Sequence, residues 1–79
     1  MVELLYFAGL KEIVGREREQ LPVQSLSVQE LLGWVRDTYS GFPSDPGAVL
    51  VAVNEEYAQL DDKITAGDVV AFIPPVSGG

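Results

Sequence analysis

Two short apolar runs, one near each end of the sequence, constrain the fold most. The first spans Val2 to Ala8, and the second, "VVAFI", spans Val69 to Ile73. Both are apolar at almost every position instead of at alternate ones, so each is expected to be a strand with little solvent on either face. Such strands are typical of the centre of a sheet. We therefore predict that the two runs lie side by side as a central parallel pair.

Between these runs the sequence indicates one main helix. Ser27 and Glu30 form a capping box, which marks where the helix begins. The two glycines and two prolines of "SGFPSDPG", from Ser40 to Gly47, predict that the helix ends near Ser40. One apolar face is expected to pack on a sheet. The residues that recur at helical spacing on this face are Val28, Leu31, Leu32, Val35 and Tyr39.

Turn residues and shorter runs predict the remaining elements. They are a helical turn at Leu10 to Val14 closed by Gly15, a strand near Arg18 to Val23, a buried strand at Ala48 to Val53, a hairpin turn at Asn54 to Tyr57 leading to a short strand, and a turn-rich crossing at Asp61 to Asp68. This order predicts an α+β fold, with a mixed sheet of about five strands packed against one main helix. That arrangement is the β-grasp, or ubiquitin-like, fold. We expect one domain over residues 1–75 and an extended functional tail over residues 76–79.

The composition argues against catalysis by side chains. The chain has no cysteine and no histidine, so it lacks the usual nucleophile, the usual base at neutral pH and the two commonest zinc ligands. Its acidic residues cluster in turns, where acids are usually solvated, so no metal site is expected. Trp34, on the flank of the helix, is expected to pack against the domain.

The net charge of −7 limits the choice of partners. It disfavours nucleic acid and anionic membranes, and it favours a partner with a basic surface. The N-terminal segment resembles a strand and not a signal peptide, and no apolar segment approaches the roughly 20 residues that span a bilayer. We therefore expect a soluble, cytoplasmic protein.

The stretch "PPVSGG" at the end of the sequence indicates where function lies. Pro74 and Pro75 cannot extend a sheet, so they end the last strand and favour an extended exit. Residues 76–79 then project roughly 13 Å at full extension, far enough to enter the active site of another protein. Gly78 and Gly79 have no Cβ atom, so they pass through a narrow channel and bring the terminal carboxylate close to other groups.

The chain resembles the small subunit of molybdopterin synthase. The matching stretches are "FAGLKEIVG" at Phe7 to Gly15, "AVN" at Ala52 to Asn54 and "AGDVVAFIPPVSGG" at Ala66 to Gly79. Two departures are visible, because Lys11 stands where the family often has arginine and Ser77 where threonine is frequent. Neither alters the chemistry of the tail, although Lys11 lacks the bidentate geometry that an arginine offers for a salt bridge to a partner.

The resemblance implies a sulfur carrier with a β-grasp fold that binds no cofactor and is not catalytic by itself. An ATP-dependent activating enzyme adenylates the carboxylate of Gly79, and sulfur then displaces AMP to form a thiocarboxylate. The carrier then inserts its tail into the large synthase subunit, in an expected heterotetramer. There the sulfur passes to cyclic pyranopterin monophosphate to build the dithiolene of molybdopterin.

The strand pattern adds a candidate docking surface. If Tyr6 and Phe72 point toward the helix-covered core, then Phe7 and Ile73 point the other way, near the tail. An apolar patch there is expected to dock on partners. The candidate site residues are Gly78 and Gly79 for the chemistry, and Phe7, Tyr57, Ile73, Pro74, Pro75, Val76 and Ser77 for partner binding.

Two other functions use the same tail. The first is a sulfur carrier for thiamin synthesis or tRNA thiolation, which shares the activation chemistry. The second is a ubiquitin-like modifier, in which a lysine amine attacks the activated carbonyl of Gly79. The tail "FIPPVSGG" favours the molybdopterin carrier over both, because it looks more like that family.

Overall fold

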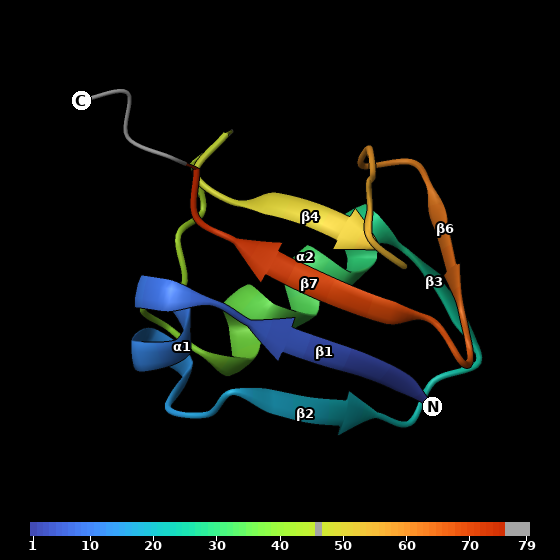
Figure 1. Cartoon of the computed structure of the whole chain (residues 1–79), viewed down its shortest axis with the longest axis horizontal. Helices are drawn as coiled ribbons and strands as arrows, with labels where there is room; N and C mark the ends of the chain where they lie inside the picture. Colours follow the sequence, from blue (N-terminus) through green and yellow to red (C-terminus); the bar gives the residue numbers. More distant parts are fainter. Residues whose placement is uncertain (46, 76–79) are drawn as a thin grey trace.

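The computed structural model describes residues 1–45 and 47–75 (Figure 1). The predicted tail, with Val76, Ser77, Gly78 and Gly79, lies outside the described residues. The elements are β1 (Val2–Tyr6), α1 (Ala8–Val14), β2 (Arg18–Leu21), β3 (Ser25–Ser27), α2 (Val28–Thr38), β4 (Leu50–Val53), β5 (Glu56–Tyr57), β6 (Lys63–Thr65) and β7 (Val69–Ile73).

The main sheet has the predicted central parallel pair. It contains five strands in the order β2-β1-β7-β4-β5. β1 and β7 are parallel, with Leu4 opposite Val70 and Tyr6 opposite Phe72, and the neighbouring pairs are antiparallel. Figure 1 shows α2 crossing behind this sheet. The β-grasp fold expected from the sequence is confirmed.

The capping box of α2 forms as predicted. The side chain of Ser27 accepts a hydrogen bond from the backbone N–H of Glu30 at 3.0 Å, and the carboxylate of Glu30 accepts one from the N–H of Ser27 at 2.8 Å. Each helix begins with unpaired backbone donors, so this reciprocal pair stabilises the first turn. The helix then buries Val28, Leu31, Leu32 and Val35 against the sheet.

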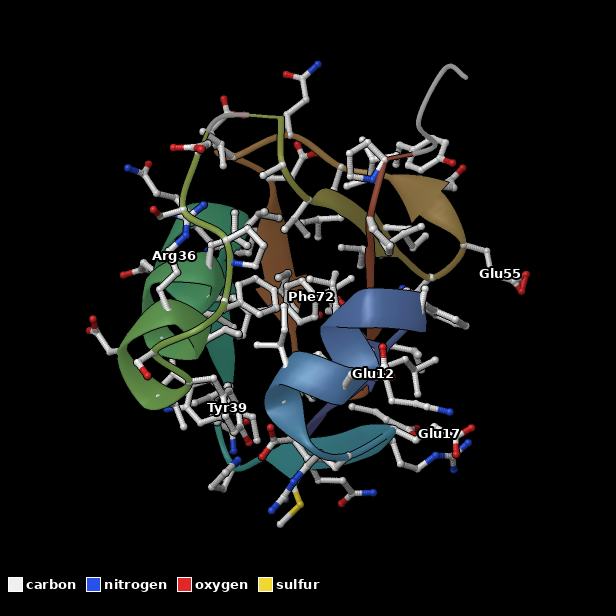
Figure 2. The ribbon with its side chains drawn as sticks, turned by 90° about the vertical axis from the view of Figure 1, so that its left-hand side faces the viewer. Glu12, Glu17, Arg36, Tyr39, Glu55 and Phe72 are labelled. Carbon is white, nitrogen blue, oxygen red and sulfur yellow. The ribbon has the colours of Figure 1, made fainter. Side chains whose placement is uncertain are left out.

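The centre of the core is aromatic. Tyr6 and Phe72 are fully buried and stack with ring centroids 5.4 Å apart, and Phe42 meets Phe72 edge to face. In Figure 2 Phe72 lies in the middle of the domain, on the side of the sheet that faces α2. Trp34 is half-buried and packs against this core, as expected.

A carboxylate ties the sheet to α2 at one end of the core. Oε1 of Glu19 accepts the hydroxyl of Tyr6 at 2.8 Å and the hydroxyl of Tyr39 at 2.6 Å. The guanidinium of Arg16 lies 3.5 Å from the other carboxylate oxygen. Burial, and then the hydrogen bond to Glu19, raises the pKa of both tyrosine hydroxyls above their ordinary value. No buried side-chain polar atom of the described residues lacks a hydrogen-bond partner.

Several predicted boundaries differ in the structure. The first strand ends at Tyr6 and not at Ala8, because Ala8 adopts φ +50° and begins α1, while Gly15 closes that helix at φ +86° as predicted. The second strand ends at Leu21 instead of Val23, before Pro22. The crossing from Asp61 to Asp68 contains a strand, β6, which pairs with β3 in a small second sheet that sequence analysis missed. Each of these strands is three residues long, too short for a clear alternation.

Candidate functional site

The second face of the central strands differs from the first. Along β7, Val70 and Phe72 are buried, whereas Val69, Ala71 and Ile73 are only half-buried. The same alternation holds along β1. The expectation of little solvent on either face is therefore wrong for this side, which we call the open face. α2 covers the opposite face of the sheet (Figure 2).

Strand register places two small residues in the middle of the open face. Ala52 on β4 is opposite Ala71 on β7, with Tyr57 beyond Ala52 and Leu5 beyond Ala71. Alanine is the smallest residue with a side chain, so this row is low in the middle and high at both ends. The result is a hollow of about 680 Å³, which we call the trough. Its lining consists of Leu5, Phe7, Ala52, Asn54, Glu55, Tyr57, Val69, Ala71 and Ile73.

One end of the trough adjoins the base of the tail. A second apolar hollow, of about 380 Å³, is lined by Phe7, Ala8, Ile73, Pro74 and Pro75. Phe7 and Ile73 line both hollows, so the trough continues to the last described residues of the chain. The N–H of Phe7 donates to the carbonyl of Phe72 at 3.2 Å, which fixes Phe7 beside the last strand.

The structure thus brings together the described residues that sequence analysis nominated for docking. Ile73, Pro74 and Pro75, which we call the tail base, lie beside Phe7. Tyr57 borders the connected trough from β5. Phe7 is 46% exposed and Tyr57 is 75% exposed, unusual values for large apolar side chains. Partner binding by these residues stays a prediction, and so do the roles of Gly78 and Gly79.

Sequence analysis missed the floor of the trough. The alternation that places Phe7 and Ile73 on the open face also places Leu5 and Ala71 there, so the sequence pattern could have predicted the face of these two residues. Ala52 was not, because its position beside Ala71 depends on the register between β4 and β7. A one-residue slip in that register would place Ala52 on the other face.

The β4–β5 turn, at the other end of the trough, is fixed by hydrogen bonds. The side chain of Asn54 accepts the N–H of Val69 and donates to the carboxylate of Asp68, both at 3.0 Å. The N–H of Thr65, followed by the side chain of Asn54, lowers the pKa of Asp68. These bonds attach the turn to the start of β7, so the trough is preformed along its length.

Charged residues lie at two edges of the sheet. Lys11, Arg16 and Arg18 all belong to α1 or to the segment that ends in β2, at one edge of the sheet. Arg18 lies 3.4 Å from the carboxylate of Glu3 there. Glu55 borders the trough near the opposite edge, which is formed by β5. Glu12, Glu17 and Glu19 belong to the same segment as these bases, so the β2 edge carries charges of both signs.

Other features of the described residues do not point to a site. A hollow of about 400 Å³ lies between α2 and residues 57–60, but it contains none of the residues at the tail base. Within ranges 1–45 and 47–75, no group of three histidine, cysteine or acidic residues is arranged to hold a metal ion. In the same ranges, no helix is long and apolar enough to cross a bilayer.

Comparisons with known proteins identify relatives that share the sequence and the fold of this chain. Residues 4–79 match the ThiS family. The human molybdopterin synthase sulfur carrier subunit is 35% identical over 99% of this chain and 93% of its own length. A molybdopterin converting factor subunit 1 of Pyrococcus furiosus superimposes with a TM-score of 0.81 at 28% identity, covering 95% of this chain and 97% of that one. A chain from the complex of subunits 1 and 2 of the Helicobacter pylori molybdopterin-converting factor has a TM-score of 0.69 at 24% identity, covering 99% and 97%, and shows the shared fold.

Proposed function

The chain belongs to the ThiS family, and we propose that within this family it is the sulfur carrier subunit of a molybdopterin synthase. Its named relatives support the assignment, since the human sulfur carrier subunit matches it from end to end. The observation on which the proposal mainly rests is the trough, which continues to the tail base at Ile73, Pro74 and Pro75. A carrier needs such a surface because its partner must hold the domain while it works on the end of the chain.

The chemistry takes place on the main chain. An activating enzyme transfers AMP from ATP to the carboxylate of Gly79 and releases pyrophosphate. A sulfur nucleophile then attacks the carbonyl carbon and displaces AMP, which leaves a thiocarboxylate. The protein itself holds no cofactor in this scheme, and ATP is consumed by the activating partner.

The thiocarboxylate then donates its sulfur. Its anionic sulfur is a good nucleophile near neutral pH, as thiolates are. It attacks a carbon of cyclic pyranopterin monophosphate in the large subunit and displaces the oxygen substituent of that carbon. Water then cleaves the bond between the acyl carbon and sulfur, which returns the Gly79 carboxylate and leaves the sulfur on the substrate. A dithiolene contains two sulfur atoms, so each product molecule consumes the sulfur of two carriers. The acid and base groups come from the large subunit, which agrees with the absence of cysteine and histidine here.

The residues of this chain position the tail. Phe7 and Ile73 present an apolar surface at its base. Pro74 and Pro75 have no backbone N–H, so they cannot extend the sheet beyond β7. The two partners therefore engage the trough and the tail together. We place the protein in the cytoplasm, where both partners work.

Reconstitution tests the proposal directly. The purified chain, its activating enzyme, ATP and a sulfur source should yield an oxygen-to-sulfur replacement that fragmentation by mass spectrometry places on Gly79. This product should convert cyclic pyranopterin monophosphate to molybdopterin when the large subunit is added. A variant lacking Gly79 should fold normally and support neither step.

The outcome of the reconstitution distinguishes the alternative functions. If the thiocarboxylate forms but only a thiamin or tRNA thiolation system uses it, the carrier belongs to another pathway. If the activated tail instead appears in isopeptide bonds to lysine, the protein is a modifier. Dithiolene formation by the variant without Gly79 contradicts all three tail-based functions.

A further inference from the structure

Glu55 occupies a backbone position that favours glycine. Val53 pairs with Glu56, so Asn54 and Glu55 form a two-residue hairpin loop with φ of +52° and +72°. Loops of this kind usually have asparagine first and glycine second, because a Cβ atom is unfavourable at the second position. Asn54 fits its position, and Glu55 does not.

The side chain of Glu55 has no structural task that explains its presence. Asn54 bonds to Asp68 and to the N–H of Val69, which fixes the turn. By contrast, no ion pair or side-chain hydrogen bond within residues 1–45 and 47–75 involves Glu55. A glycine would therefore form the same turn with less strain.

Glu55 instead faces the proposed docking surface. It lines the trough together with Tyr57. Figure 2 shows its carboxylate projecting from the turn on the side of the sheet away from α2. The tail base lies at the other end of β7, about 13 Å away at roughly 3.3 Å per residue. Glu55 and the tail base thus mark opposite ends of one largely apolar surface.

The neighbouring acid points elsewhere. Glu56 pairs with Val53, whereas Tyr57 pairs with Ala52 on the open face, so the side chains of Glu56 and Tyr57 lie on opposite faces of the hairpin. The carboxylate of Asp68 is already bound by Asn54 and Thr65. Of these three acids, only Glu55 lines the trough.

We propose that Glu55 is a specificity-determining residue, whose carboxylate pairs with a lysine or arginine of the large synthase subunit next to an apolar side chain that enters the trough. This inference rests on the proposed function. A tail inserted at one end leaves the domain free to rotate about that attachment, and a charge pair at the far end removes this freedom. The large subunit is the expected occupant because the chain has a net charge of −7, which favours a partner with a basic surface, and the large subunit is the partner that holds the domain while the tail reacts.

The test compares charge changes on the two faces of one hairpin. Glu55→Arg and Glu55→Gln remove the proposed pair, and Glu56→Arg makes the same charge reversal on the opposite face. Association with the purified large subunit is measured at several salt concentrations. We expect Glu55→Arg to weaken binding about tenfold or more and to reduce its salt dependence, and Glu55→Gln to weaken it about threefold. Glu56→Arg should stay within about twofold of the native protein.

Glu55→Gly adds a readout that a structural role cannot mimic. This variant should be more resistant to urea than the native protein, because the strain is relieved, and yet bind the large subunit less tightly. Equal binding by the native protein and by Glu55→Arg overturns the inference. So does a loss of adenylation with unchanged binding to the large subunit, which assigns Glu55 to the activating enzyme. If the native protein itself does not bind the large subunit, it is the proposed function that fails.

Discussion

The two faces of the sheet differ in burial and in backbone conformation. On the face toward α2, Tyr6 and Phe72 are fully buried and stack on each other, and the buried polar atoms of the described residues have partners. On the open face, Phe7 and Tyr57 remain exposed. Among the described residues, the non-glycine residues with positive φ are Ala8, Asn54 and Glu55, and they border the hollows of that face. Stability is thus concentrated on one side, while the other side keeps features that a stable monomer does not need.

The largest expected effect comes from replacing one aromatic residue on each face and comparing the losses of stability. Phe72→Ala should lower the free energy of unfolding by about 3–5 kcal/mol, because it leaves a cavity in the core. Phe7→Ala should lower it by less than about 1 kcal/mol, because Phe7 is 46% exposed. Urea denaturation followed by circular dichroism measures both. Similar losses from the two variants would mean that the faces do not differ in this way.

The next test asks whether the open face serves binding. Tyr57→Ala should change the free energy of unfolding by less than about 0.5 kcal/mol, because the side chain is 75% exposed. The same variant should bind the large subunit about tenfold less tightly or worse, since exposed tyrosines at interfaces are often hot spots. Calorimetric titration gives the affinity. Unchanged affinity would remove Tyr57 from the docking surface.

The polar cluster of the covered face predicts a response to alkaline pH. The folded-state pKa of Tyr6 is raised above its ordinary value of 10.0, by burial first and by Glu19 second. Stability from the protonated hydroxyl is therefore complete below about pH 10 and is lost as the pH rises above that value. Tyr6→Phe should cost about 1 kcal/mol at pH 7. The free energy of unfolding of Tyr6→Phe should then fall less between pH 9 and pH 11 than that of the native protein, as measured by urea denaturation at each pH. Parallel curves of unfolding free energy against pH would contradict this account.

The smallest expected effect concerns the start of α1. Ala8 has φ +50°, which favours glycine, whereas Gly9 follows it inside the helix with open space around the position of a Cβ atom. Exchanging the two residues, Ala8→Gly with Gly9→Ala, should stabilise the protein by about 0.5 kcal/mol for each change. Thermal unfolding of the two single variants and the double variant measures this. Destabilisation by Gly9→Ala would show that the helix start is constrained by something other than backbone preference.

Much of the fold was predictable because local and long-range signals agree. The capping box at Ser27 and Glu30 and the two apolar terminal strands each have one good structural solution. The small sheet of β3 and β6 was not predictable, since each strand has three residues and its main buried contribution is Ile64. Short strands gain their stability from pairing, which a linear pattern does not reveal.

The candidate site was predictable to a similar degree. Alternation placed Phe7 and Ile73 on the side away from the helix, and the structure confirms that placement. The floor of the trough needed the register of β4 against β7, and the role of Glu55 needed the backbone angle at the turn. Neither the strand register nor the backbone angle can be predicted from residue types alone, because both depend on how distant segments pack together.

The position of β7 also has a consequence for folding during synthesis on the ribosome. β7 follows the other strands in the sequence, so it is the last of them to emerge from the ribosome, yet it fills the middle of the sheet between β1 and β4. Nascent chains thus hold β1 without its parallel neighbour until β7 has been synthesised, and the pairing of these distant strands comes after the other strands have been made. The trough and the tail base appear together when β7 docks. A chain that lacks β7 therefore has neither the trough nor the tail base, because residues of β7 line both hollows.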